Sequence, residues 1–135
     1  MVEHFDGTGA ILDSAYVGVA ISGMAFNPAN GRLYVLTSHD VLLGPDVYVF
    51  DTRNHYAVLG AFFVTSGGSP VMSAFGGAGL EMDCDGHLWL VDAEAQVIYE
   101  VESEETGACF FDDIPWLTEN PPSPSVPPGG TGIIG

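Results

Sequence analysis

The feature that most constrains the fold of this chain is a hairpin pattern that occurs twice. The segment GMAFNPANGRLYVLT (residues 23–37) aligns with GLEMDCDGHLWLVD (residues 79–92), and the second copy has one residue fewer in its turn. In each copy apolar and polar residues alternate on both sides of the turn, as they do in strands with one buried face. The turns end in Asn-Gly and Asp-Gly, which supply the positive φ angles that a two-residue hairpin turn requires. The sequence therefore predicts two β-hairpins of the same design.

A third and a fourth strand follow each predicted hairpin, and a matching pair of strands begins the chain. The segments that match as third strands are VEHFDGTG (2–9), DVYVFDTRN (46–54) and QVIYEVESE (96–104). The segments that match as fourth strands are AILDSAYV (10–17), AVLGAFFV (57–64) and ACFFDDI (108–114). The equivalent positions Phe5, Phe50 and Val101 are 45 and 51 residues apart. That period, with four strands in each unit, is typical of β-propeller blades.

The order of these motifs resembles β-propeller blades of the NHL/YVTN-like group, over roughly residues 1–114. The matching elements are a glycine, an apolar strand, Asn-Gly or Asp-Gly, then LYVLT or LWLVD, then VYVFD or VIYEVE. The tail DDIPWLTENPPSPSVPPGGTG resembles a segment of large bacterial secreted proteins, some subtilisin-like peptidases among them, in which Ig-like repeats follow a propeller-like region. The resemblance implies an all-β fold of about two and a half four-stranded antiparallel blades from the C-terminal part of a ring.

The predicted organisation is a blade region and a tail. The blade region, residues 1–117, divides into a half blade (1–17) and two blades (19–64 and 75–114), and a Pro/Gly-rich linker or tail covers 118–135. A closed propeller has about four to eight blades, and each blade buries its faces on its neighbours. The chain is therefore expected to be a fragment of a larger ring or a module that completes a ring between copies. A two-sheet β-sandwich built from the same strands is the third arrangement.

The charge balance limits the partners. Eighteen Asp and Glu oppose two Arg and no Lys, so the net charge is −16. Such a surface repels phosphate backbones and anionic membranes, and no apolar run approaches the length of about 18 residues that a membrane span requires. The remaining partners are a protein or carbohydrate ligand, other copies of the chain, adjoining blades and an Ig-like domain. An even number of cysteines, the lack of Lys and the Pro/Gly-rich tail favour an extracellular or cell-surface location. The N-terminal segment MVEHFDGTG lacks the pattern of a signal peptide and is typical of a domain interior.

The segment Asp83-Cys84-Asp85-Gly86 is predicted to be a tight turn between strands. A calcium loop needs six or more oxygen ligands, and here two carboxylates are suitably spaced with no glutamate at EF-hand spacing. No cofactor is therefore expected, and calcium at this turn is the alternative. Zinc is not expected, because no second Cys or His follows at a metal-binding interval.

Cys84 and Cys109 are the candidate disulfide. Cys84 is predicted in the turn between the first and second strands of one blade, and Cys109 at the start of its fourth strand, at the same end of the blade. The first and fourth strands are about 14 Å apart at the usual strand spacing. A bridge therefore requires the chain to bend across that end of the blade. Two reduced, partly buried thiols are the alternative.

No catalytic site is predicted. The histidines are scattered along the chain, at positions 4, 39, 55 and 87, and TSGGSP (65–70) is predicted to be a flexible loop and not a nucleophile elbow. The glycines of FGGAGLE (75–81) are expected to let an inner strand approach the ring axis closely. Glu100 and Glu102 share one face of a strand that is expected to point to solvent, and such spacing does not establish a glycosidase pair.

The aromatic residues of the strands suggest a core and not a catalytic site. Trp89, Tyr34, Tyr48 and Tyr99 are expected between blades, with a sugar-stacking platform as the alternative. Together these observations predict a non-catalytic binding or scaffold module of a secreted or cell-surface protein. The alternatives are a self-assembling structural module and part of a propeller hydrolase or lactonase.

Overall fold

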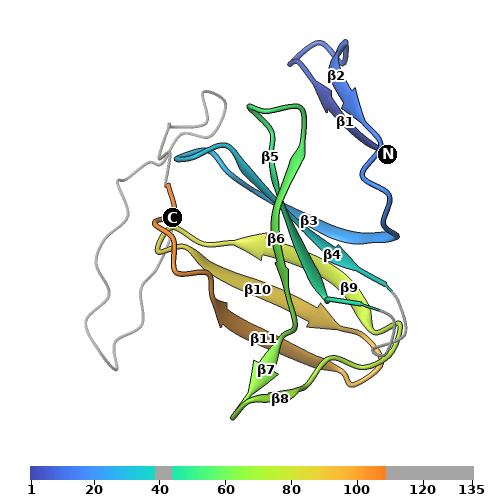
Figure 1. Ribbon diagram of the computed structural model, residues 1–135, viewed down its shortest axis with the longest axis vertical. Coiled ribbons are helices and arrows are strands. Elements are labelled where there is room, and N and C mark those ends of the chain that lie inside the picture. The colour runs from blue at the N-terminus through green and yellow to red at the C-terminus, as the bar shows by residue number, and fades with distance from the viewer. Residues whose placement is uncertain (39–43, 109–135) are drawn as a thin grey trace, which may run out of the picture.

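The computed structural model describes residues 1–38 and 44–108 (Figure 1). All regular structure in these ranges is β, which confirms the predicted all-β class. The described residues contain no helix of the length and apolarity that a membrane-spanning segment needs. The strands are β1 (Val2–Phe5), β2 (Ile11–Ala15), β3 (Ile21–Asn27), β4 (Arg32–Thr37), β5 (Val47–Asp51), β6 (Ala57–Phe62), β7 (Thr65–Ser66), β8 (Ser69–Pro70), β9 (Gly77–Met82), β10 (His87–Asp92) and β11 (Val97–Glu102).

The strands form four antiparallel sheets in sequence order. They are the hairpin β1-β2, the four-stranded sheet β3-β4-β5-β6, the small hairpin β7-β8 and the three-stranded sheet β9-β10-β11. Residues 109–114, predicted as most of a fourth strand beside β11, lie outside the described residues. Among the described residues no sheet closes on itself, so the blade arrangement stays a prediction.

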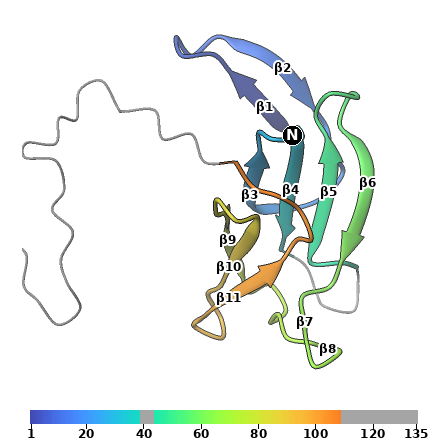
Figure 2. The same ribbon diagram turned by 90° about the vertical axis from the view of Figure 1, so that its left-hand side faces the viewer.

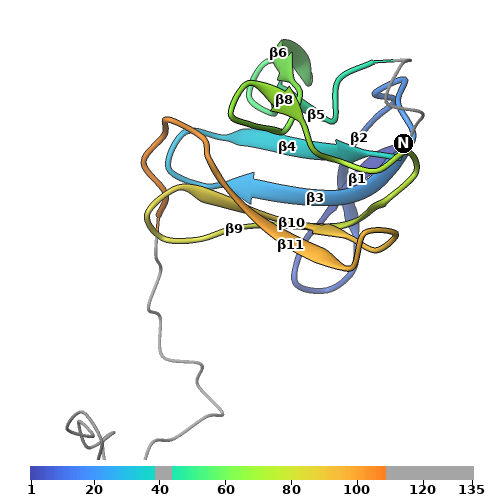
Figure 3. The ribbon, with the colours of Figure 1, turned by 90° about the horizontal axis from the view of Figure 1, so that it is seen from below.

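The two larger sheets pack face to face around the main hydrophobic core. The centre of this core is fully buried and includes Leu36, Val47, Leu88 and Leu90, with Tyr34 at 2% exposure. Figure 3 shows the neighbouring strands β3 and β9 running side by side where the sheets meet. These alternating apolar residues become buried because each strand presents every second side chain to the facing sheet.

Glycines make the close contact of β9 with β3 and β4 sterically feasible. A Cβ atom on Gly23 would lie 2.7 Å from the backbone nitrogen of Leu80, and one on Gly77 would lie 2.9 Å from the carbonyl oxygen of Thr37. Neither backbone atom can move independently of its strand. Gly77 of the segment 75–81 thus allows a close contact with the neighbouring sheet, while the close approach to a ring axis that was expected of these glycines stays a prediction.

The other face of the four-stranded sheet carries a second core. Val2 of β1 is buried there in one cluster with Leu33, Val35 and Phe50. Figure 2 shows the β1-β2 hairpin at one end of the molecule, beyond β3–β6 as seen from the β9–β11 sheet. Three layers therefore follow one another: the hairpin, the four-stranded sheet and the three-stranded sheet.

The turns differ from the predicted two-residue type. Four residues separate β3 from β4 and four separate β9 from β10. Gly31 and Gly86 have φ angles of 76° and 93°, while the residues before them do not have positive φ. The side chains of Asn27 and Asp83 explain the longer turns, because each accepts a hydrogen bond from the backbone two residues ahead, at 3.0 Å in both cases.

A two-residue hairpin turn does occur, in a segment that was predicted to be a flexible loop. Thr65–Ser66 and Ser69–Pro70 pair as β7 and β8. The two residues between them, Gly67 and Gly68, have φ angles of 57° and 83°. Two consecutive residues with positive φ are what a type I′ turn requires, and glycine adopts them without strain.

Candidate functional site

The most chemically distinctive surface is the side of the β9–β11 sheet that faces away from the four-stranded sheet. Register places Trp89 of β10 between Glu81 of β9 and Glu100 of β11. The neighbouring pairs across β10 and β11 are His87 with Glu102 and Val91 with Ile98. We call this side of the sheet the outer face. Its side chains are those of Glu81, His87, Trp89, Val91, Ile98, Glu100 and Glu102. It combines an exposed aromatic ring, an imidazole and several carboxylates on one regular sheet.

His87 lies at the centre of the carboxylates. Its Nδ1 atom is 3.1 Å from Oε1 of Glu100 and 3.4 Å from Oδ2 of Asp83. Its Nε2 atom is 3.0 Å from Oε1 of Glu102. Both ring nitrogens therefore face carboxylate oxygens, and the ring is held in one orientation between the turn and strand β11.

Backbone and side-chain donors fix the carboxylate of Asp83. Its Oδ1 atom accepts hydrogen bonds from the backbone N–H groups of Asp85 and His87, at 3.0 and 2.9 Å. Its Oδ2 atom accepts one from the indole Nε1 of Trp89, at 2.8 Å. The indole hydrogen bond is the main cause that holds the pKa of Asp83 below its usual value.

The surroundings of His87 favour its charged form. Partial desolvation alone would lower the pKa of the imidazole. The charges of Glu102, Asp83, Glu100 and Asp85 outweigh this effect and raise the pKa above its usual value. The outer face is therefore a place where a positive charge is stabilised.

The aromatic residues are divided between core and surface. Tyr34 belongs to the main core, and Tyr99 packs against that core and donates a hydrogen bond from its hydroxyl to the carbonyl oxygen of Val71. Tyr48 packs against the second core. Trp89, which was also expected between blades, is 40% exposed and belongs to neither cluster of the described residues. The difference arises because Trp89 is on the opposite side of β10 from Leu88 and Leu90.

The predicted turn at residues 83–86 is confirmed, and the segment after β11 lies against it. A Cβ atom on Gly107 would lie 2.6 Å from the carbonyl oxygen of Cys84. The chain thus bends across this end of the sheet, which is the condition that a bridge between Cys84 and Cys109 requires. Cys109 lies outside the described residues, so the disulfide stays a prediction.

The same segment joins the two hairpin turns of the repeat. Glu105 forms an ion pair with Arg32 and accepts a hydrogen bond from the side-chain amide of Asn30. The side-chain amide of Asn27 donates to the carbonyl oxygen of Thr106, at 3.0 Å. One of the two arginines of the chain therefore has a structural role at the junction of the two sheets.

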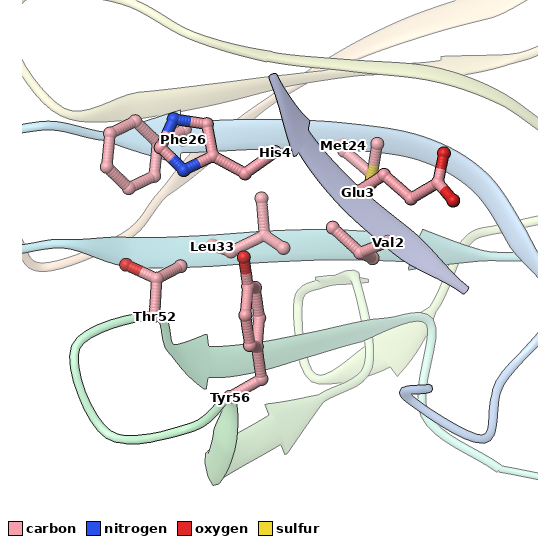
Figure 4. A pocket seen from close by; sticks show the side chains of 8 residues that line it. All are labelled: Val2, Glu3, His4, Met24, Phe26, Leu33, Thr52 and Tyr56. Carbon is pink, nitrogen blue, oxygen red and sulfur yellow. The ribbon is translucent and has the colours of Figure 1, made fainter. Parts of the chain in front are cut away.

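A second candidate site is a pocket of about 280 Å³ beside strand β1 (Figure 4). Its apolar lining comes from β1, β3 and β4, and its polar lining comes from β1 and from the turn between β5 and β6. The lining residues are Val2, Glu3, His4, Met24, Phe26, Leu33, Thr52 and Tyr56. Its volume is close to the lower limit of pockets that hold small organic ligands, about 300 Å³.

The sequence pattern did not reveal the grouping around His87. It was described as one of four scattered histidines, and Glu100 and Glu102 were noted only as residues on one face of a strand. The signal that could have found the site is the strand register, because pairing β10 with β11 places His87 opposite Glu102 and diagonal to Glu100.

Comparison with protein-family models, with curated proteins and with solved structures finds no match for this chain.

Proposed function

We propose that this chain is a non-catalytic scaffold and binding module, built from β-propeller blades and belonging to a secreted or cell-surface protein. The observation that carries the proposal is the serial stacking of its sheets, with an incompletely covered face at each end. Strands β3 to β6 have the strand order of a blade, and β9 to β11 repeat its first three strands. The contact between β3 and β9, the first strands of the two units, is the one that inner strands of adjacent blades make.

The first open end is the pocket beside β1 described above, which we call the groove. In the described part of the chain β1 pairs with β2 alone, so its other edge has no strand beside it. The adjacent side chains Met24 and Phe26 of β3 are 46% and 51% exposed and line the pocket. An open strand edge next to exposed apolar side chains is the arrangement that accepts an added strand.

The second open end is the outer face. Trp89, Val91 and Ile98 give it apolar area, and Glu81, Glu100 and Glu102 give it negative charge. A docking partner of matching chemistry has apolar and cationic groups. A protein partner would be an adjoining blade or a separate protein with basic side chains. A carbohydrate partner would stack a sugar ring on Trp89.

Self-assembly is the second candidate function, and the open edge of β1 favours it. Copies of the chain can complete each other's sheets if an exposed strand of one copy pairs with β1 of the next. The net charge of −16 opposes such contacts at low ionic strength. Self-assembly should therefore strengthen when salt screens the charge.

The test combines light scattering with the binding of ANS, a dye that reports exposed apolar surface. The native chain and the variants Met24→Glu and Phe26→Glu are measured at low and at high salt. Phe75→Glu is the matched control, because Phe75 is 66% exposed and does not line the groove. A monomer that binds ANS, with binding reduced by Met24→Glu and Phe26→Glu but not by Phe75→Glu, supports docking of a partner at the groove.

A single species of about three or four chains at high salt, abolished by the groove variants, supports self-assembly, since propellers have about four to eight blades. A monomer whose ANS binding is unaffected by the groove variants would overturn the proposal, because the groove would then be ordinary surface.

A further inference from the structure

We propose that Asp83, His87 and Glu100 form a binding site on the outer face for a divalent transition-metal ion of the zinc class. One oxygen of each carboxylate and one nitrogen of the imidazole lie within 4.8 Å of one another. The turn before β10 supplies Asp83, the first residue of β10 is His87, and β11 supplies Glu100. The site is independent of the groove beside β1, and its failure would leave the proposed scaffold function intact.

The two nitrogen-to-oxygen distances are close to those around a small ion, and the two carboxylate oxygens lie within 4.8 Å of each other. Zinc binds imidazole and carboxylate at about 2.0–2.2 Å, so tetrahedral donors are about 3.3–3.5 Å apart. The Nδ1 atom of His87 is 3.1 Å from Oε1 of Glu100 and 3.4 Å from Oδ2 of Asp83. Small side-chain rotations on an exposed surface suffice to adjust the first distance, because the Glu100 side chain is 51% exposed.

The His87 ring turns Nδ1 toward two carboxylate oxygens. Its Nε2 atom lies 3.0 Å from Oε1 of Glu102, and with the ring N–H at Nε2 the lone pair of Nδ1 faces the other two carboxylate oxygens. A lone pair at Nδ1 would repel both oxygens, so a proton or a metal ion has to lie between them. One N–H group can align well with only one of the two oxygens. A metal ion can coordinate both oxygens and the nitrogen at once.

Glu102 acts as a positioning residue in this site. Histidine ligands commonly donate their second ring N–H to a carboxylate, which fixes the tautomer and strengthens the ligand. The N–H groups of Asp85, His87 and Trp89 orient the Asp83 carboxylate in the same way. The remaining coordination positions face solvent, so a water molecule or a group of a partner can complete the sphere.

Calcium fits the same residues poorly. It takes about six to eight oxygen ligands and no imidazole, and here one of the three donors is a nitrogen. From the sequence, calcium at the turn was the metal alternative, and zinc was not expected because no second Cys or His lies at a C-x-x-C or H-x-x-x-H interval. The imidazole and the two carboxylates are ligands of the kind that zinc, cobalt and nickel bind. Two of these donors, His87 and Glu100, come from strands and not from the turn.

The experiment uses Trp89 as the reporter, because its indole N–H donates to the ligand Asp83. The chain carries Trp116→Phe, which leaves Trp89 as the only tryptophan, and any free thiols are blocked with iodoacetamide. Zinc, cobalt and calcium are titrated separately while tryptophan emission is recorded, and calorimetry gives the zinc stoichiometry. We expect saturable binding of one zinc per chain, quenching by cobalt, and no response to calcium at the same concentrations.

The variants separate a site from a general charge effect. His87→Gln and Glu100→Gln should each weaken zinc binding at least about 10-fold, since each removes a ligand, and Glu102→Gln should weaken it about 10-fold. Glu81→Gln is the matched control, because Glu81 flanks Trp89 on the opposite side and contributes the same charge. Absence of saturable binding at 1 mM zinc would overturn the proposal, and so would an equal loss of affinity in Glu81→Gln and Glu100→Gln.

Discussion

Replacement of Asp92 should destabilise the fold more than any change of a surface carboxylate. Asp92, the last residue of β10, is fully buried. Its Oδ2 atom accepts a hydrogen bond from the backbone N–H of Ser73 at 2.7 Å, and its Oδ1 atom accepts one from Ala95 at 2.9 Å. It therefore ties the segment before β9 to the turn after β10. Hydrogen bonds to a charged acceptor contribute about 1.5–3 kcal/mol each, so Asp92→Ala should cost about 3 kcal/mol or more.

The measurement is urea unfolding at pH 7, followed by circular dichroism. With a slope of about 1–3 kcal/mol per molar urea, a loss of 3 kcal/mol lowers the midpoint by about 1 M or more. Asp92→Asn keeps one acceptor but turns its NH2 group toward the other backbone N–H, so it should lose about as much as Asp92→Ala. Asp85→Ala is the control, because Asp85 is exposed in the turn at the other end of β10. A loss below about 1 kcal/mol in Asp92→Ala would refute the reasoning that these two bonds stabilise the sheet.

Asp92 also gives stability a definite pH dependence. Burial acts to raise its pKa, but hydrogen bonds from the backbone of Ala95, Ser73 and Glu94 outweigh it, and the pKa lies below its usual value. A carboxyl whose folded pKa is depressed stabilises the fold above its unfolded pKa of about 3.9, and this contribution is lost as the pH falls through the folded pKa. The acid loss of stability below about pH 4 should therefore be shallower in Asp92→Asn than in the native chain.

Two other predictions concern the junction of the sheets and the cysteines. Gly23→Ala should destabilise the fold by about 1–3 kcal/mol, because its Cβ would lie 2.7 Å from the backbone nitrogen of Leu80. The same change at Gly60, where a Cβ meets no atom within 4 Å, should have a far smaller effect in thermal unfolding, and equal effects would contradict the close contact. If Cys84 and Cys109 are bridged, thiol titration of unfolded, unreduced protein should find no thiol, and reduction should cost about 3 kcal/mol. Two reactive thiols per chain would show that the bridge is absent.

The repeat made most of the strand layout predictable. Alternation of apolar and polar residues located the hairpins at residues 23–37 and 79–92, because burial of one face determines which positions must be apolar. The turn conformations were less predictable. Asn27 and Asp83 occupy equivalent places in the repeat, yet their role as acceptors for the turn backbone became clear only with the atoms in place.

The outer face shows why the site was harder to predict than the fold. The alternating pattern predicts that Trp89 and Leu88 point to opposite sides of the sheet. It does not predict which residues of the next strand lie beside them. That depends on the register between β10 and β11, which pairs Trp89 with Glu100. The aromatic residue looked like core because aromatic residues usually are, while the carboxylates beside it indicate an exposed surface.

The two ends of the stack differ in chemistry, and this limits how the molecule can assemble. The groove beside β1 is mainly apolar, whereas the outer face carries Trp89, Val91 and Ile98 among carboxylates. With only two arginines against 18 acidic residues, a second copy cannot supply the cations that this face would need in a buried contact. A divalent ion held by Asp83, His87 and Glu100 would neutralise two carboxylates beside the apolar side chains Trp89, Val91 and Ile98, and so lower the cost of burying this face. Association through the outer face should then depend on zinc, while association through the groove should depend on salt alone.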